Sequence, residues 1–401
     1  MTHCINVYKG LRYTNSGEVM FCCKSENWLD DKDGIPVNIA THTFDEATNG
    51  KIATEIRNDL ENGIRHKNCK KCWEEEDAGI KSKRILDNNR AEEYWGKEYL
   101  HDKTASAEIV ELNLGTICNL KCRICGPWSS SKWVKEHYEI NNKKELFSQY
   151  MEQVKKWQGN WEDDSPSWIH IENSLQHLKQ IDFYGGEPFL VEKNWSILQK
   201  SVDAGYSKNQ ILHFNTNGTQ YNENHIDILK KFKFVLISLS IDDLYERFEY
   251  QRHPAKWNEV YENIIKFTEL AKNTDSIDVA VCITVNTLNV LHVPEIVKFY
   301  DEMQLPYYVN LLHGPPYYNV RNIKQSIKEK ITDKYKCDIN NLSEYSKNSL
   351  KTVLSYMNNY ISSDEPWTEF IKFTKAKDKY RKESFEETFP ELFSIIEKSN
   401  K

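Results

Sequence analysis

Three cysteines stand close together in the stretch GTICNLKCRICGPW, residues 115–128. Cys118, Cys122 and Cys125 have the spacing C-x3-C-x2-C and follow the apolar run EIVELNL. A structural zinc site closes with four ligands, and no further Cys or His follows here at zinc-finger spacing. Thiolates suit an iron-sulfur cluster, and a cubane held by three of them keeps one iron free of protein. An open iron of this kind can bind a substrate or a cofactor.

A second polar motif, GGEP, follows the apolar run LKQIDFY. It consists of Gly185, Gly186, Glu187 and Pro188. Its glycines allow the backbone to approach a ligand closely. Alone, the motif also fits an ordinary turn between a strand and a helix, but its place one strand after the cysteine motif indicates a shared site.

The elements that must position these motifs follow from the pattern of apolar residues after residue 108. Short apolar runs alternate there with longer amphipathic stretches such as WNEVYENIIKFTELAK and VPEIVKFYDEM, which predict helices. Repeated strand-helix-strand units predict a parallel α/β fold, in which ligands gather at the carboxyl ends of the strands. The runs predicted to be strands are EIVELNL, LKQIDFY, QILHFNT, FVLISLSI, IDVAVCITV and YYVNLLH.

The cysteine spacing at the end of the first predicted strand, with GGEP at the end of the second, resembles the radical S-adenosylmethionine (SAM) superfamily. The resemblance implies a partial (β/α)6 TIM-like barrel and a 4Fe-4S cluster on the three cysteines, whose free iron chelates the amino and carboxylate groups of SAM. The reduced cluster then cleaves SAM to a 5'-deoxyadenosyl radical, which abstracts a hydrogen atom from a substrate. Glu187 and neighbouring backbone carbonyls are implied to bind the SAM ammonium.

Three later segments resemble the same family less specifically. NTNGT begins at Asn215 and SLSIDD contains Ser240, and the resemblance implies that these polar strand ends face SAM. YQRHPAKWNEV contains Arg252, which is implied to approach the SAM carboxylate. Each segment also fits a helix cap, a turn or a surface charge.

A second set of cysteines lies near the N-terminus. Cys4, Gly17 and Cys22 have the spacing C-x12-G-x4-C, and Cys69 and Cys72 follow as C-x2-C. This order resembles the twitch form of the SPASM modules, which implies one auxiliary 4Fe-4S cluster. Such modules usually follow the barrel, whereas this one precedes it. Two alternatives stay open: the neighbouring Cys23 in place of Cys22, and a zinc ribbon on the same four cysteines.

The composition of the chain limits its cellular compartment and its classes of binding partner. The 401 residues are 39% hydrophobic and include ten cysteines, and no apolar leader or membrane-length apolar stretch is seen, so we expect a cytoplasmic protein with no membrane segment. The net charge of −7 disfavours a nucleic-acid surface. Cys282 is expected in the core and Cys337 as a free thiol. The resemblance adds an electron donor such as a flavodoxin or ferredoxin as a partner.

Three parts of the chain are predicted. Residues 1–105 form a loop-rich, twitch-like or SPASM-like module, 106–320 the radical SAM barrel and 321–401 a helical C-terminal extension. Residues 141–175 interrupt the barrel and predict a helix plus a loop over its mouth.

The expected substrate is a peptide or protein side chain, so the chain is predicted to be a radical SAM oxidoreductase or peptide-modifying enzyme. The aromatic stretches WQGNW and HGPPYYNV offer surface for an extended chain, although they also fit packing of the insertion on the barrel. Two alternatives are a radical SAM dehydrogenase of a small aminocyclitol or sugar-like substrate, and a catalytically silent, cluster- or zinc-stabilised interaction protein. The hypothesis of an ordinary methyltransferase has less support, because the sequence contains no glycine-rich nucleotide-binding loop of the kind that such folds carry.

Overall fold

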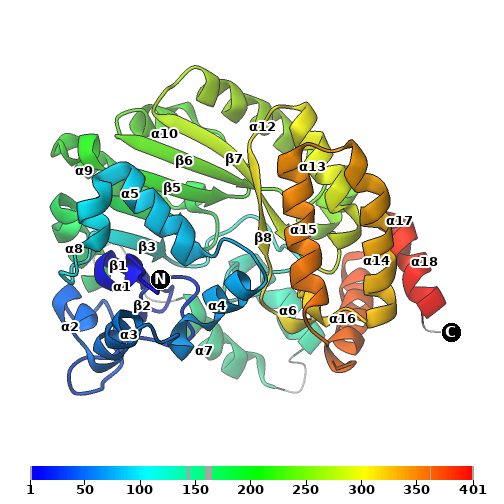
Figure 1. The fold of residues 1–401 in the computed structure, drawn as a ribbon, viewed down its shortest axis with the longest axis horizontal. Coiled ribbons are helices and arrows are strands. Elements are labelled where there is room, and N and C mark those ends of the chain that lie inside the picture. The colour runs from blue at the N-terminus through cyan, green and yellow to red at the C-terminus, as the bar shows by residue number, and fades with distance from the viewer. Residues whose placement is uncertain (1, 142–144, 159–164, 362, 400–401) are drawn as a thin grey trace. The chain divides into compact units, whose positions relative to one another are not determined.

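The structure, a computed structural model, describes residues 2–141, 145–158, 165–361 and 363–399 (Figure 1). The chain divides into two compact units. Unit 1 consists of Met1–Ile117, Glu152–Asn215 and Asn222–Leu236. Unit 2 consists of Cys118–Met151, Thr216–Tyr221 and Ile237–Lys401.

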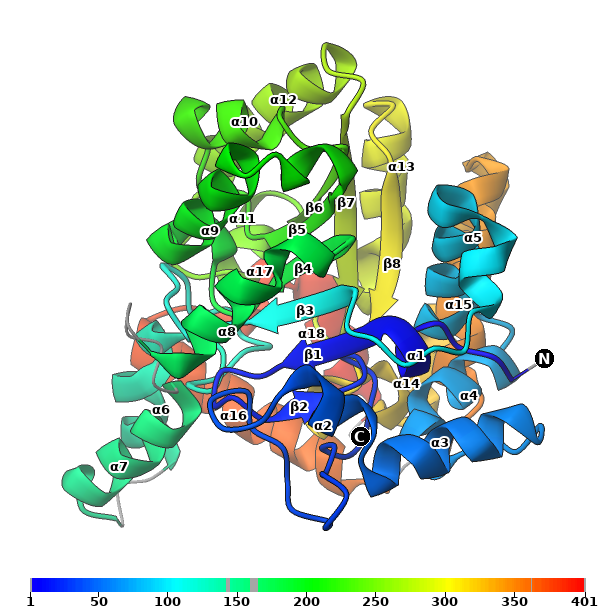
Figure 2. The same cartoon turned by 90° about the vertical axis from the view of Figure 1, so that its left-hand side faces the viewer.

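The strands of unit 1 form a sheet in the order β2-β1-β3-β4-β5. Strand β1 pairs antiparallel with β2 and parallel with β3, beside which it lies in Figure 2. The pairs β3–β4 and β4–β5 are also parallel. The strands are β1 (Gly10–Tyr13), β2 (Val19–Met20), β3 (Ile109–Asn113), β4 (Gln180–Tyr184) and β5 (Ile211–Thr216).

One face of this sheet is apolar and packs on helix α9 (Glu192–Asp203). Phe214 of β5 stacks on Phe183 of β4, with ring centroids 4.6 Å apart, and on Trp195 of α9, at 5.8 Å. All three side chains are buried. Strand residues alternate between the two faces, so the apolar positions of neighbouring strands meet here.

The opposite face carries a row of four ionisable residues in register across four strands: Arg12, Glu111, Asp182 and His213. We call it the charged row. Helix α5 (Lys83–His101) supplies a partner, because Lys83 Nζ lies 3.0 Å from Glu111 Oε1. Glu111 and Asp182 are buried. A buried carboxylate is costly unless it is paired, which ties α5 to this face.

The N-terminal segment holds more helix than the loop-rich segment that the sequence predicted. Its helices are α1 (Asn6–Lys9), α2 (Phe44–Thr48), α3 (Lys51–Glu61), α4 (Lys70–Asp77) and α5. In α3, Ala53, Ile56 and Leu60 are buried at helical spacing. Charged residues separate these apolar positions in the sequence, so the segment contains no long apolar run that would have indicated the helix.

Unit 2 contains the strand order β6-β7-β8, with β7 and β8 parallel. The strands are β6 (Phe234–Ser240), which begins in unit 1, β7 (Ile277–Val285) and β8 (Tyr307–Leu311). Helices α11 (Tyr245–Gln251), α12 (Trp257–Lys272) and α13 (Val293–Glu302) follow or separate them. Strands β3 to β8 coincide with the six predicted runs, and α12 with its predicted helix.

The C-terminal extension is helical, as predicted. It comprises α14 (Gln325–Asp338), α15 (Glu344–Asn358), α16 (Glu365–Arg381), α17 (Phe385–Thr388) and α18 (Pro390–Ser399). The predicted insertion contains α7 (Phe147–Gln158) and α8 (Pro166–Ser174). Residues 159–161 of the WQGNW stretch lie outside the described residues.

The predicted fold class is confirmed: the chain is an α/β protein with a parallel sheet, consistent with a partial barrel, and a helical C-terminus. Among the described residues, no helix is both long and apolar enough to cross a membrane. The boundaries near residues 105 and 320 stay predictions.

The first testable prediction concerns the apolar face. Phe214→Ala removes a fully buried ring from between Phe183 and Trp195, so we expect the free energy of unfolding to fall by about 3–5 kcal/mol. Denaturant titration measures this loss. Phe147→Ala is the control, because that ring is 49% exposed, and its loss should stay near 1 kcal/mol. Equal losses in the two variants would contradict the assignment of Phe214 to the core.

Candidate active site

Cys118, Cys122 and Cys125 lie in the loop that follows β3, in unit 2. Cys122 is buried and the other two are half-buried. The loop is tightly turned: the Cys125 N–H donates to the Cys122 carbonyl at 3.0 Å, and the Leu120 N–H donates to Cys118 Sγ at 3.4 Å. All three thiols thus belong to one compact turn, which the sequence spacing predicted.

The end of helix α11 fixes this cysteine loop, defined as residues 118–125. The Lys121 N–H donates to the His253 carbonyl at 2.8 Å, and the Arg123 N–H donates to the Gln251 carbonyl at 2.7 Å. These two bonds flank Cys122. They place the residue between them, Arg252, next to the thiols.

Arg252 is the charged partner of Cys122. Its Nη1 lies 4.0 Å from Cys122 Sγ, and its Nη2 lies 2.8 Å from Asp242 Oδ2. The hydrogen bond from Cys125 lowers the pKa of Cys122, and the Arg252 charge lowers it further against the opposing effect of burial. The same hydrogen bond and burial raise the pKa of Cys125 well above its ordinary value. The shared hydrogen bond thus shifts the pKa values of the two thiols in opposite directions, downward for Cys122 and upward for Cys125.

The GGEP motif lies in unit 1 and packs on Ile117, the residue before Cys118. Gly186 has a φ of +55°, and a Cβ there would lie 2.2 Å from the Ile117 carbonyl oxygen. The Glu187 N–H donates to the same carbonyl at 2.7 Å. Glycine is required at Gly186 by this close approach to the Ile117 carbonyl, while the predicted approach of the motif to a ligand stays a prediction.

Glu187 is buried and caps the short helix η4 (Pro188–Leu190). Its Oε1 accepts the Phe189 N–H at 3.0 Å, and the Asn194 amide donates to the Pro188 carbonyl at 3.1 Å. The carboxylate is thus held in a fixed orientation by its own backbone. A buried, oriented carboxylate fits the binding of an ammonium group.

The NTNGT segment contacts the cysteine loop through residues that the sequence analysis did not single out. Asn217 Nδ2 donates to Asn119 Oδ1 at 2.9 Å, and Asn119 Nδ2 donates to Thr219 Oγ1 at 2.8 Å. Asn119 lies between Cys118 and Cys122, so this ring of hydrogen bonds supports the loop. The predicted Asn215 and Ser240 are both half-buried strand-end residues, in unit 1 and unit 2 respectively.

The four N-terminal cysteines of the predicted set come together in unit 1. Cys4, Cys22, Cys69 and Cys72 line one small hollow. Burial raises the pKa of Cys4 well above its ordinary value, and the charges of the other three cysteines raise it further. A metal is the ordinary way to relieve such crowding, because it holds the sulfurs as thiolates.

Cys23 points elsewhere. It does not line the hollow, and its N–H donates to Glu111 Oε2 of the charged row at 2.9 Å. Burial and then the Glu111 charge raise the pKa of Cys23 to about 12. The structure therefore separates the two neighbouring cysteines that the sequence left as alternatives.

Within the described part of the chain, the one group of three or more Cys, His, Asp or Glu ligand atoms that all lie within 4.8 Å of one another is Glu55, Asp59 and His66.

Comparison with known families decides what the cysteine loop belongs to. Residues 112–302 match the family described as the Radical SAM superfamily. The match covers less than half of the chain, and the cysteine loop lies within it. The cysteine triad, GGEP, Asn215, Ser240 and Arg252 all lie inside it. The N-terminal cysteines and helix α16 lie outside the matched residues.

Solved structures similar to this chain match it over part of their length. The structure described as hexahistidine-tagged anSMEcpe with bound AdoMet is 19% identical, with a TM-score of 0.39 over 57% of this chain and 57% of that one. Streptococcus suis SuiB bound to precursor peptide SuiA is 14% identical, with a TM-score of 0.39 over 72% of this chain and 60% of that one. The chain thus spans less than two thirds of these proteins. No curated protein sequence matches it.

A prediction follows for the glycine that packs on Ile117. Gly186→Ala should lower the free energy of unfolding more than Gly205→Ala, which is the control. Both glycines have positive φ, which costs an alanine about 1–2 kcal/mol, but a Cβ at Gly205 meets nothing within 4 Å. Denaturant titration of the two variants gives the difference. Equal losses would mean that the Ile117 contact is not required.

Proposed function

We propose that this chain is a radical SAM enzyme whose Cys118, Cys122 and Cys125 hold a 4Fe-4S cluster. The observation that carries the proposal is the single compact turn containing three thiols, one of them 4.0 Å from the Arg252 guanidinium, within the residues that match the Radical SAM superfamily. The donor set fits the group, because three thiolates leave one iron of a cubane free. When bound, the cluster supplies the electron that cleaves SAM reductively, and the resulting radical abstracts a hydrogen atom from the substrate.

The chain's own residues bind and orient SAM. Gly185 and Gly186 let the backbone pass close to the ligand, Pro188 begins the short helix behind them, and Glu187 accepts the SAM ammonium. Asn215 and Ser240 are polar strand ends that face SAM in this proposal. Arg252 stabilises the Cys122 thiolate, and its approach to the SAM carboxylate rests on the family resemblance.

Cys4, Cys22, Cys69 and Cys72 hold a second, auxiliary 4Fe-4S cluster in this proposal. Support comes from their shared hollow, which Cys23 does not line. Four protein thiolates leave no iron open to SAM, so this site serves electron transfer or shapes the substrate pocket.

The substrate in this proposal is a peptide or protein side chain, and a flavodoxin or ferredoxin supplies the electron. Support for the peptide comes from the twitch-like cysteine order. The aromatic stretch HGPPYYNV does not add to it, because Tyr318 is fully buried and Tyr317 stacks on Phe373 of α16 at 4.9 Å. These two rings pack the extension rather than offer a free surface.

The test of the proposal is anaerobic reconstitution with iron and sulfide, followed by SAM and dithionite. Wild type should form 5'-deoxyadenosine, and Cys118→Ala, Cys122→Ala or Cys125→Ala should form none, because two thiolates do not hold the open cluster. Cys337→Ala is the control, since that thiol is exposed on α14. If the wild type loads iron fully but forms no 5'-deoxyadenosine, the assignment as an enzyme is wrong.

If the auxiliary site holds a cluster, substitution of Cys22 and substitution of Cys23 should change the iron content differently. Wild type should bind about eight irons, Cys22→Ser about four, and Cys23→Ser about eight, because only Cys22 lines the hollow. Iron and sulfide analysis of the anaerobically prepared proteins measures this. Cys22→Ser should still cleave SAM, but without modifying the substrate. Four irons plus one zinc in wild type would replace the auxiliary cluster with a zinc ribbon.

A further inference from the structure

Two cations of the C-terminal extension bind the backbone of the cysteine loop directly. Lys377 Nζ donates to the Arg123 carbonyl at 3.0 Å, and Arg381 Nη2 donates to the Lys121 carbonyl at 2.7 Å. The two residues are one turn apart on α16, so they project from the same side of that helix. Their acceptors are the residues on either side of Cys122.

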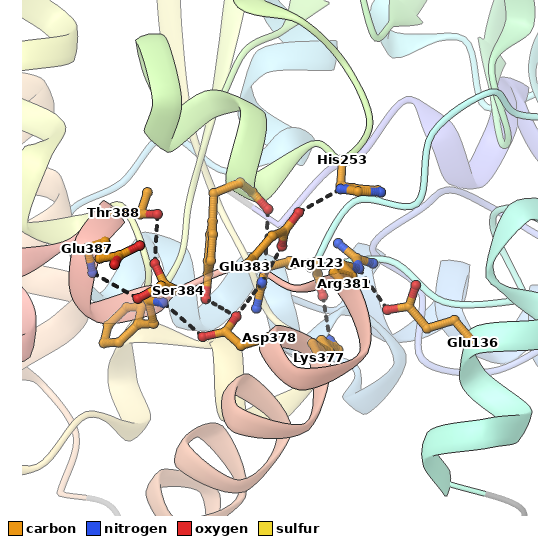
Figure 3. A network of polar contacts seen from close by, with 12 residues as sticks. Arg123, Glu136, His253, Lys377, Asp378, Arg381, Glu383, Ser384, Glu387 and Thr388 are labelled. Carbon is orange, nitrogen blue, oxygen red and sulfur yellow. Dashed lines mark hydrogen bonds and ion pairs between the residues drawn. The ribbon is translucent and has the colours of Figure 1, made fainter.

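The loop binds α16 in return through Arg123 (Figure 3). The Arg123 side chain is fully buried, and its Nη2 lies 2.5 Å from both Asp378 Oδ1 and Glu383 Oε2. Its guanidinium also lies 3.4 Å from the centroid of the Tyr250 ring. Cations of the helix thus hold the loop backbone, while carboxylates of the extension hold the loop side chain.

The short helix η2 (Ser131–Trp133) and helix α6 (Val134–Asn141) complete this arrangement. Trp133 Nε1 donates to the Cys122 carbonyl at 3.0 Å, so the carbonyls of residues 121, 122 and 123 all have side-chain donors. Glu136 accepts from Arg381 Nε at 2.7 Å and pairs with Lys121 at 2.7 Å. Buried carbonyls that lost such donors would carry a large desolvation cost, so the loop geometry depends on them.

Of these two side chains, Arg381 places positive charge near Cys122, whereas burial and the charges of Arg123 and Arg381 hold the pKa of Lys377 well below its ordinary value. The Arg381 charge acts on Cys122 in the same direction as that of Arg252. Positive charge and fixed hydrogen bonds near the ligands favour the reduced, more negative state of an iron-sulfur cluster. The contacts of α16 therefore bear on the readiness of such a cluster to accept an electron, as well as on how firmly it is held.

We propose that Lys377 and Arg381 are positioning residues for the cluster, which makes α16 a working part of the site. This inference rests on the proposed function, because it assumes that the cysteine loop carries the cluster. Neither residue touches SAM or substrate in this proposal. They act through the Lys121 and Arg123 carbonyls, which set where the Cys122 sulfur lies, and Arg381 acts through its charge as well.

The experiment compares full-length variants reconstituted anaerobically. Lys377→Met and Arg381→Met remove the donor and the charge at similar length, and Lys375→Met is the control because Lys375 is exposed on the same helix. We expect iron release to a chelator about tenfold faster or more in the first two variants. We also expect an altered electron paramagnetic resonance spectrum of the reduced cluster in both variants, and a lower midpoint potential in Arg381→Met, which loses a positive charge near Cys122. The control should match wild type in all three.

Arg381→Lys separates charge from geometry and guards against a folding defect. It keeps the positive charge but loses the fork that joins Glu136 to the Lys121 carbonyl. We expect a potential near that of wild type together with faster iron release.

Two outcomes would overturn the inference in different ways. If wild type loads the cluster and the Lys377 and Arg381 variants match the control in potential and release rate, α16 has no positioning role. If wild type loads no more iron than Cys118→Ala does, the proposed function fails first, and the two failures are told apart by that single comparison.

Discussion

The burial of the Arg123 guanidinium is the constraint on which the cysteine loop depends. A fully buried cation next to the thiols is unstable unless its charge is balanced and its donors are used. Asp378 and Glu383 balance the charge, the Tyr250 carbonyl accepts from Nε, and the Tyr250 ring lies against the guanidinium, so that all of these partners come from segments far along the chain. With Arg123 fixed in this way, the carbonyls on either side of Cys122 accept hydrogen bonds from Lys377 and Arg381 of α16. A helix without any cysteine thereby supports the cysteine loop.

In unit 1, buried charges are also balanced by partners from distant segments of the chain. The charged row places Glu111 and Asp182 in a buried position, and Lys83 of α5 and Arg12 of β1 balance Glu111. Glu111 also accepts the Cys23 N–H, which turns the Cys22–Cys23 peptide so that Cys23 faces the row while Cys22 lines the hollow. A carboxylate on a strand nearly ninety residues later thus helps to give two adjacent cysteines different surroundings.

This difference between local and distant causes explains what the sequence could predict. The triad, GGEP and the six strands are local patterns, in which spacing and apolar periodicity carry the information, and the strands were found where they were predicted. Asn119, Lys377 and Arg381 carry no local signal, because an Asn in a loop or a Lys on a helix is ordinarily a solvated group. Their roles follow from partners about one hundred to two hundred and sixty residues away. The helices of residues 1–105 were missed for another reason, since α3 buries only a narrow stripe among charges.

The electrostatics of the cysteine loop indicate how it meets a metal. Three thiolates crowded in one turn would repel one another, yet the turn here is already closed by backbone bonds to α11 and by the donors from α16. Arg252 and Arg381 lower the pKa of Cys122, whereas its hydrogen bond to Cys122 and burial raise the pKa of Cys125. The backbone of the loop is therefore already ordered by contacts that involve no metal. The conformational entropy of the loop is therefore lost when the chain folds, because the C-terminal extension packs against the loop at that stage.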